Sequence, residues 1–286
     1  MKIQRASHLG MCFGVRDAIA LAETQANELP LTIFGELVHN ETVLAGLRKK
    51  GIQIARDAGQ IKTETVMITA HGTSQNSLNQ LKERNHMVVE ATCPLVHFAH
   101  RSLKKLAEAG FYPIIIGKRD HVEVRGMTDD LKEFDVVLFE ADIAKLEEHP
   151  RLGIISQTTQ PIERVRHLVE LIQQRFPNTE IRFIDTVCQP TKNRQRAAAD
   201  LARQSDVVVV IGGAHSNNTR ELVATCQQFC ERVFHVQSAD DLRREWFAGA
   251  ANIGITAGTS TPDETIAGVE QCVRELTQNS VSVEHS

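Results

Sequence analysis

Val88-Val89-Glu90-Ala91-Thr92-Cys93-Pro94-Leu95 is the stretch from which the fold of this 286-residue chain can be predicted. Its β-branched run predicts a short strand that Pro94 ends, and residues 96–109 then have the pattern of a helix. Cys93 is therefore expected at the carboxyl end of a strand, facing the amino terminus of a helix. That position is electropositive and favours a thiolate.

The same pattern occurs around two other cysteines. Cys188 ends a second strand and precedes a helix predicted over residues 192–204, and Cys12 stands between a first strand and a helix predicted over residues 16–27. Three cysteines at strand ends, each opening a helix, predict three equivalent ligands of one central group.

A longer repeat surrounds these cysteines. Each cysteine is followed by a helix, a strand and then a histidine. The histidine lies 27, 28 and 27 residues after its cysteine in the three cases. These histidines are His39, His121 and His215. Each unit continues to another strand that ends in a loop of small polar residues, at 70–74, 156–159 and 256–260. The recurrence predicts three units of similar build.

Strands that alternate with helices, with polar loops at their carboxyl ends, are typical of parallel α/β sheets. We predict three α/β subdomains in a pseudo-threefold, trefoil arrangement around one central ligand site, because ligands bind beyond the carboxyl ends of such strands. An iron–sulfur cluster at that centre is considered below with the cysteines. The subdomains are expected at 1–93, 94–187 and 188–278, followed by a flexible tail at 279–286.

Composition and charge argue against some classes of partner. With 42% hydrophobic residues the chain can bury a substantial core, and its net charge of −4 argues against a nucleic-acid partner. No apolar run approaches the length of a membrane span, so no membrane partner is expected. We expect a cytoplasmic protein, where cysteines are reduced and metal binding or catalysis is a better interpretation than disulfides.

Six cysteines divide into two sets. Cys226, Cys230 and Cys272 fall in helical patterns and are interpreted as buried structural thiols. The three strand-end cysteines leave one iron of a four-iron cluster without a protein ligand, as a catalytic metal site requires. Two alternatives to the cluster stay open. One is a zinc ion held by three cysteines and a water, and the other is that all three cysteines are merely buried thiols.

Several polar side chains in the predicted loops suit a polyanion. Imidazoles, hydroxyls and amides donate hydrogen bonds to groups such as a diphosphate, and His71 lies in one of the repeated loops. The remaining histidines, including His97 and His100, are interpreted as ordinary packed or exposed residues. Glu123 follows His121 by two residues. It is either an acid kept protonated near a cluster or a solvated glutamate, and spacing does not separate these interpretations.

Together, the motifs resemble the LytB/IspH family of iron–sulfur reductases. The resemblance runs in order from Gly10 to about Pro262, nearly the whole chain. The motifs that carry it are Gly10-Met11-Cys12-Phe13-Gly14-Val15, Glu36-Leu37-Val38-His39-Asn40, Ala70-His71-Gly72, Ala91-Thr92-Cys93-Pro94-Leu95-Val96, His121-Val122-Glu123-Val124, Gln157-Thr158-Thr159, Asp185-Thr186-Val187-Cys188 with Asn193-Arg194-Gln195, Ser216-Asn217-Asn218, and Thr256-Ala257-Gly258-Thr259-Ser260.

The resemblance implies reduction of 4-hydroxy-3-methylbut-2-enyl diphosphate to isopentenyl and dimethylallyl diphosphates, the last step of the methylerythritol phosphate route to isoprenoids. It implies a [4Fe-4S] cluster, with a [3Fe-4S] form on oxidation, and ferredoxin or flavodoxin as electron donor. The implied cluster ligands are Cys12, Cys93 and Cys188. The implied diphosphate-binding residues are His39, His71, His121, Ser216, Asn217, Asn218 and Ser260. Glu123, Thr158 and His121 are the implied catalytic residues, with Thr158 also contacting substrate.

The chain departs from the family pattern at a few positions. Val122 stands where the family usually has proline, Arg125 where it has glutamate, and Asn217 where it has a second serine. Two other functions stay open. One is a divergent iron–sulfur enzyme acting on another allylic or phosphorylated alcohol, and the other is a cluster-bearing redox or ligand sensor.

Overall fold

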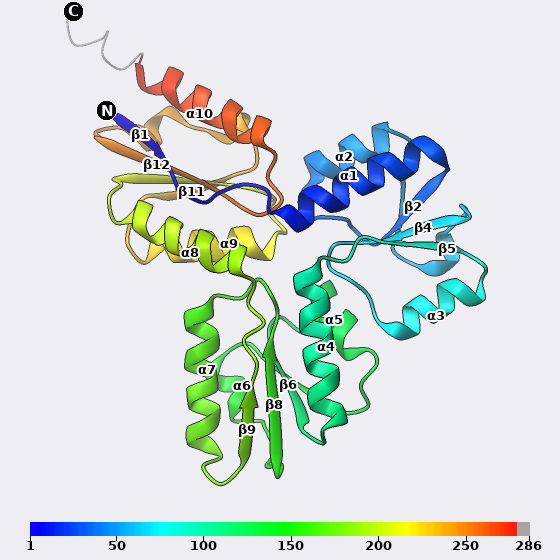
Figure 1. Ribbon diagram of the computed structural model, residues 1–286. Coiled ribbons are helices and arrows are strands. Elements are labelled where there is room, and N and C mark those ends of the chain that lie inside the picture. Colours follow the sequence, from blue (N-terminus) through cyan, green and yellow to red (C-terminus); the bar gives the residue numbers. More distant parts are fainter. Residues whose placement is uncertain (279–286) are drawn as a thin grey trace, which may run out of the picture. The chain divides into compact units, whose positions relative to one another are not determined.

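A computed structural model describes residues 1–278 of the chain, so the proposed tail at 279–286 lies outside the described residues. The chain forms three four-stranded parallel sheets with helices between successive strands (Figure 1). The predicted α/β class is confirmed. The placing of three subdomains around one central cluster stays a prediction.

The elements follow one another in the order expected for parallel crossovers. The strands are β1 Lys2–Arg5, β2 Leu31–Phe34, β3 Gln53–Ala55, β4 Thr65–Ile68, β5 Met87–Glu90, β6 Tyr112–Ile116, β7 Asp135–Val137, β8 Arg151–Ser156, β9 Glu180–Phe183, β10 Val207–Ile211, β11 Val233–Val236 and β12 Asn252–Ala257. The α-helices are α1 Phe13–Glu28, α2 Glu41–Lys49, α3 Gln75–Glu83, α4 Pro94–Glu108, α5 Val122–Thr128, α6 Glu140–Ile143, α7 Ile162–Arg175, α8 Gln189–Ala202, α9 Asn217–Gln227 and α10 Asp263–Gln278, with short 3-10 turns at Ala58–Gln60, Ala239–Asp241 and Arg244–Phe247.

All three sheets have the same strand order. The orders are β3-β2-β4-β5, β7-β6-β8-β9 and β11-β10-β12-β1. β10 shows the continuous apolar run of a strand whose sheet is covered on both faces, and all of Val207–Ile211 is buried. The structure therefore contains the internal repeat that the spacing of cysteines and histidines predicted.

The first strand does not belong to the same sheet as the rest of the predicted subdomain 1–93. β1 pairs in parallel with β12, with Ile3 opposite Ile253, so it completes the sheet of residues 207–257. The reason is that the sheet of β2 to β5 already has its own edge strand, β5, whereas the last sheet has only three strands without β1.

By compactness the chain separates into two units. Among the described residues, unit 1 comprises residues 1–13, 38–43 and 189–278, and unit 2 comprises residues 14–37 and 44–188. Unit 2 thus contains two of the sheets, and unit 1 contains the sheet that β1 completes.

The helices that follow the cysteines begin earlier than predicted. α1, α4 and α8 start directly after Cys12, Cys93 and Cys188, at residues 13, 94 and 189, rather than at 16, 96 and 192. Proline is well suited to the first position of a helix, because its missing N–H would have no intrahelical partner there. Pro94 therefore opens α4 as well as ending the strand before it.

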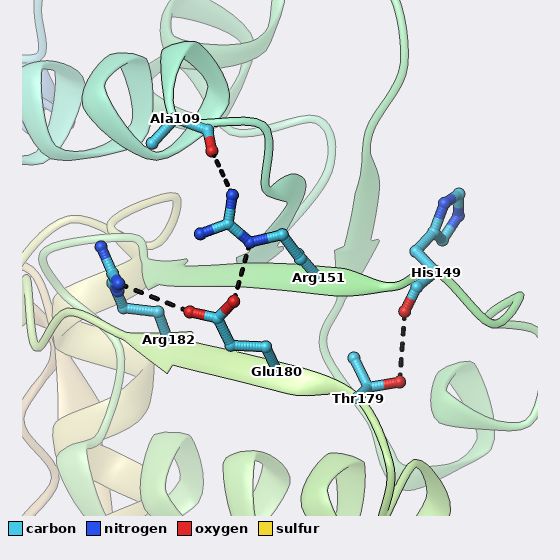
Figure 2. A network of polar contacts seen from close by, with 6 residues as sticks. All are labelled: Ala109, His149, Arg151, Thr179, Glu180 and Arg182. Carbon is cyan, nitrogen blue, oxygen red and sulfur yellow. Dashed lines mark hydrogen bonds and ion pairs between the residues drawn. The ribbon is translucent and has the colours of Figure 1, made fainter.

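The amino-terminal ends of β8 and β9 are joined by a polar network (Figure 2). Arg151 donates to the Ala109 carbonyl at 2.6 Å and to Glu180 at 2.8 Å, while its guanidinium lies 4.0 Å from the ring centre of Phe111. Arg182 also lies over Phe111, at 4.6 Å. The aromatic ring is buried, so this network closes the end of the core remote from the strands' carboxyl termini.

Gly153, in the middle of β8, is required by close packing. A Cβ at this position would lie 2.9 Å from Phe111 Cβ and 3.0 Å from Leu106 Cβ. We predict that Gly153→Ala lowers the free energy of unfolding by about 1–3 kcal/mol in urea titrations, because the added methyl group would overpack the core. Gly46→Ala is the control, because a Cβ in that α2 position meets nothing within 4 Å and should be neutral or stabilising. Equal effects of the two substitutions would contradict this account.

Candidate functional site

The three strand-end cysteines are held by the same backbone hydrogen bond. The amide of Cys12 donates to the Thr259 carbonyl at 3.2 Å, that of Cys93 to Ala70 at 3.1 Å, and that of Cys188 to Thr158 at 3.0 Å. Each acceptor lies in the loop after the strand next to the cysteine's own strand. The bond continues the parallel ladder past the strand ends, so all three thiols occupy equivalent places at the carboxyl edges of their sheets.

These thiols are accessible enough to bind a group. Cys12, Cys93 and Cys188 are each partly exposed, whereas Cys226 and Cys230 are buried. In unit 2 the backbone of Gly14 approaches Cys93 so closely that a Cβ would lie 2.6 Å from its sulfur. The glycine therefore leaves space at the thiol that any other residue would fill.

Within residues 1–278, no three His, Cys, Asp or Glu side chains converge on the position of a single metal ion. Cys12 belongs to unit 1, and Cys93 and Cys188 belong to unit 2. A cubane cluster makes a different demand from a single ion, because each cysteine binds a different iron. Three equivalent, partly exposed thiols fit that donor set.

Cys226, Cys230 and Cys272 lie outside this strand-end setting, as predicted, but Cys272 is partly exposed rather than buried. Burial raises the pKa of Cys226 to about 12, with a smaller contribution from Cys230. Cys226 lies in α9, but that helix ends at Gln227, so the predicted helical setting of Cys230 is wrong. Thiols held neutral in a core are poor ligands and nucleophiles.

Two candidate anion-binding histidines come together in unit 2. The rings of His71 and His121 meet edge to face with centroids 5.7 Å apart. His121 is the N-cap of α5, and its Nδ1 accepts a hydrogen bond from the Glu123 amide at 3.2 Å. Val122 occupies the first helical position, so α5 begins there without the proline that the family usually has.

Glu123 is buried, so it is not a solvated glutamate. It is 1% exposed, and both carboxylate oxygens accept hydrogen bonds from Thr158, one from its amide at 2.7 Å and one from its hydroxyl at 3.0 Å. Burial raises the pKa of Glu123 to about 7, and the two hydrogen bonds from Thr158 oppose that rise. A carboxyl with this pKa can be protonated and can give up its proton near neutral pH.

Unit 1 contains the other candidate substrate-binding residues. Ser216 caps α9 by accepting from the Thr219 amide, and Asn218 accepts from the Thr259 amide at 3.0 Å. In the part of the chain that the structure describes, three polar atoms here are buried and have no hydrogen-bond partner. They are Asn217 Nδ2, Asn218 Nδ2 and Ser260 Oγ.

His39 is close to this group in unit 1. A Cβ at Gly213 would lie 2.2 Å from the His39 carbonyl oxygen, and the neighbouring Asn40 donates to the Ser260 carbonyl at 2.9 Å. His215, which the repeat placed beside His39 and His121, is exposed. The helices α2, α5 and α9 are capped at equivalent positions of the repeat, by Asn40, His121 and Ser216. His39 and His215 each lie one residue before that position, so only His121 of the three repeated histidines caps a helix.

No role was assigned from the sequence to several residues that support the site. Arg194 is 6% exposed and donates to the Gly10 carbonyl at 2.6 and 3.0 Å, which fixes the segment leading to Cys12. Thr219 is fully buried between Gly212 and Gly258, where a Cβ would lie 2.4 or 2.2 Å from its hydroxyl oxygen. The glycines themselves were a signal of this close approach.

Comparisons with known proteins identify the family to which this sequence is similar. A family profile described as LytB protein matches residues 3–274. The chain is 34% identical to 4-hydroxy-3-methylbut-2-enyl diphosphate reductase of Geobacter metallireducens over 278 residues, covering 96% of this chain and 98% of the relative. It is 35% identical to the reductase of that name from Campylobacter hominis, covering 96% and 100%.

Two solved structures of diphosphate reductases also match this chain. One described as (E)-4-hydroxy-3-methyl-but-2-enyl diphosphate reductase, the terminal enzyme of the non-mevalonate pathway, matches with TM-score 0.70 and 33% identity, covering 96% of this chain and 99% of that one. The E-1-hydroxy-2-methyl-but-2-enyl-4-diphosphate reductase from Plasmodium falciparum matches with TM-score 0.90 and 26% identity, covering 96% and 88%. Among residues 1–278, no helix has the length and apolar character needed to cross a bilayer.

The Glu123 carboxyl should be half protonated at about pH 7, protonated below and ionised above. Thr158→Val removes a donor that stabilises the carboxylate, so the variant's Glu123 pKa should be higher than the parent's. Infrared difference titration against Glu123→Gln would measure both values. Thr159→Val is the control, since the Thr159 hydroxyl accepts from Gln157 rather than contacting Glu123. A parent pKa near 4.5 would contradict the assignment.

Proposed function

This chain belongs to the LytB protein family, and on that premise we propose that it is a 4-hydroxy-3-methylbut-2-enyl diphosphate reductase. The reaction takes two electrons and two protons, breaks the allylic C–O bond and releases water with isopentenyl or dimethylallyl diphosphate. The observation that carries the proposal is the buried Glu123 carboxyl, held by Thr158 in the unit that also contains Cys93 and Cys188.

The chain is an iron–sulfur protein in this proposal. Cys12, Cys93 and Cys188 would hold the cluster, which we assign as [4Fe-4S] with a [3Fe-4S] form on oxidation. The support is their equivalent backbone anchoring and partial exposure. When bound, the cluster supplies an electron path and a Lewis-acidic iron without a protein ligand.

Diphosphate recognition is assigned to seven polar residues. His71 and His121 of unit 2 are suited to donate to phosphate oxygens, as are His39, Ser216, Asn217, Asn218 and Ser260 of unit 1. The amides of Asn217 and Asn218 and the Ser260 hydroxyl support this role, because buried polar groups without partners in residues 1–278 are costly unless a ligand satisfies them. These donors require no large positive field, in agreement with a net charge of −4.

Glu123 is proposed as the acid that protonates the departing hydroxyl. Its two hydrogen bonds to Thr158 fix the direction of the carboxyl, and burial keeps it protonated up to about pH 7. Thr158 is proposed to orient the hydroxyl beside this carboxyl. His121 holds the amide of Glu123 and is the third proposed catalytic residue.

The electron donor is proposed to be a ferredoxin or a flavodoxin, because the reaction needs two electrons that the diphosphate substrate does not supply. The cytoplasm is the proposed location, where such carriers and reduced thiols occur.

Anaerobic turnover tests the proposal directly. The cluster-loaded protein, reduced by dithionite through methyl viologen, should convert 4-hydroxy-3-methylbut-2-enyl diphosphate to the two products. Turnover of another allylic or phosphorylated alcohol in its place would favour the divergent enzyme. Cluster loading without turnover of either class would favour the sensor, although a sensor has no need of a buried acid at Glu123.

Loss of a cluster ligand should be specific to three cysteines. Anaerobically purified protein should contain iron and sulfide, and Cys12→Ser, Cys93→Ser or Cys188→Ser should lose most of both. Cys226→Ser, in the core of unit 1, is the control and should keep the parent's iron content per folded chain. Loss of iron from Cys226→Ser with retention in Cys93→Ser would overturn the assignment.

Glu123→Gln should separate binding from chemistry. Glutamine keeps the size of the side chain but cannot deliver a proton, so kcat should fall about 10²–10⁴-fold with little change in KM. Iron content and the spectral response to substrate should stay the same as in the parent. Near-parental turnover with a strong reductant would show that another group protonates the hydroxyl.

A further inference from the structure

His100 lies where three site-bearing segments of unit 2 meet. It belongs to α4, which begins directly after Cys93. A Cβ at Gly72, beside His71, would lie 3.4 Å from His100 Nε2, and a Cβ at Gly126 in α5 would lie 3.6 Å from its Cε1. The His100 ring therefore lies against the backbone of two segments, the turn that carries His71 and the helix that carries Glu123.

Both segments are closely packed around this ring. Gly72 has φ +74°, a left-handed conformation that favours glycine, and a Cβ there would also lie 3.1 Å from the Thr92 methyl. A Cβ at Gly126 would lie 3.3 Å from Thr73 Cα, so α5 and the turn are in close contact. His100 thus fills the space on the α4 side of the contact between them.

The imidazole is a neutral polar group rather than a charge. Burial lowers the pKa of His100 to about 4, His97 lowers it further, and Asp130 acts in the opposite direction. Among residues 1–278, His100 Nε2 is buried without a hydrogen-bond partner, and so is the Thr92 hydroxyl, whose methyl adjoins the same glycine. A leucine would avoid this cost, so packing alone does not account for a histidine here.

We propose that His100 is a positioning residue for the reductase reaction, and this inference rests on the proposed function. Its neutral ring sets the distance between the His71 turn and α5. The distance between these two segments in turn determines how closely the His71 and His121 rings approach, and their centroids are 5.7 Å apart. The nitrogen gives this contact a polar atom that becomes satisfied when the diphosphate and its water enter. His100 does not itself need to touch the reacting atoms.

The test uses two substitutions of His100 in the cluster-loaded enzyme. His100→Phe keeps a ring but removes both nitrogens, so KM for substrate and Kd for inorganic diphosphate should rise about tenfold, or about 1.4 kcal/mol, with kcat changed less than about twofold. His100→Gln keeps a neutral polar group, and it should restore both constants to within about threefold of the parent. Thermal midpoints of the two variants should agree.

His97→Phe is the matched control, because His97 lies one turn earlier in α4 and its half-exposed ring pairs with Glu90 at 3.2 Å. It should bind diphosphate as the parent does. The positioning role is overturned if His100→Phe keeps the parent's KM and Kd, if His97→Phe loses as much, or if His100→Gln shows no rescue. These outcomes differ from failure of the proposed function, in which the parent itself would not turn over the allylic diphosphate.

Discussion

One backbone hydrogen bond, made three times, positions the proposed chemistry of this protein. The amide of each strand-end cysteine donates to a loop carbonyl that follows the neighbouring strand, at 3.0 to 3.2 Å. Because the bond uses main-chain atoms, it fixes the thiol without using the side chain. The sulfur is left to bind a metal, and the helix that begins at the next residue directs its positive end to the same place.

Thr158 links two parts of this arrangement. Its carbonyl accepts the amide of Cys188, while its own amide and hydroxyl donate to the two oxygens of Glu123. One residue therefore holds a proposed cluster ligand through its carbonyl and the proposed proton donor through its amide and hydroxyl. The cost of burying the Glu123 carboxyl is partly offset by these bonds, and the remaining cost keeps its pKa near neutrality.

Much of this could be predicted from the sequence, because the relevant signals are local. The run Val207–Ile211 can hardly be anything but a buried strand, and the repeated setting of Cys12, Cys93 and Cys188 predicted three similar units. The pairing of β1 with β12 could not be predicted in this way, since a short strand carries no signal for a partner near the other end of the chain. The burial of Glu123 was also hidden, because it depends on Thr158 from another strand end. His100 looked like an ordinary helical histidine, and only its approach to Gly72 and Gly126 distinguishes it from His97.

The pairing of the first strand with the last also orders events on the ribosome. Cys93 and Cys188 bond to carbonyls that are made shortly before them, but Cys12 bonds to that of Thr259, which is made only when most of the chain has been synthesised. At bacterial and eukaryotic synthesis rates the interval between Cys12 and Thr259 lasts roughly 10–50 s. The first thiol to emerge is thus the last to be anchored. If all three cysteines hold the proposed cluster, the complete set of ligands exists only after translation has passed Thr259, and Cys12 has to stay reduced until then.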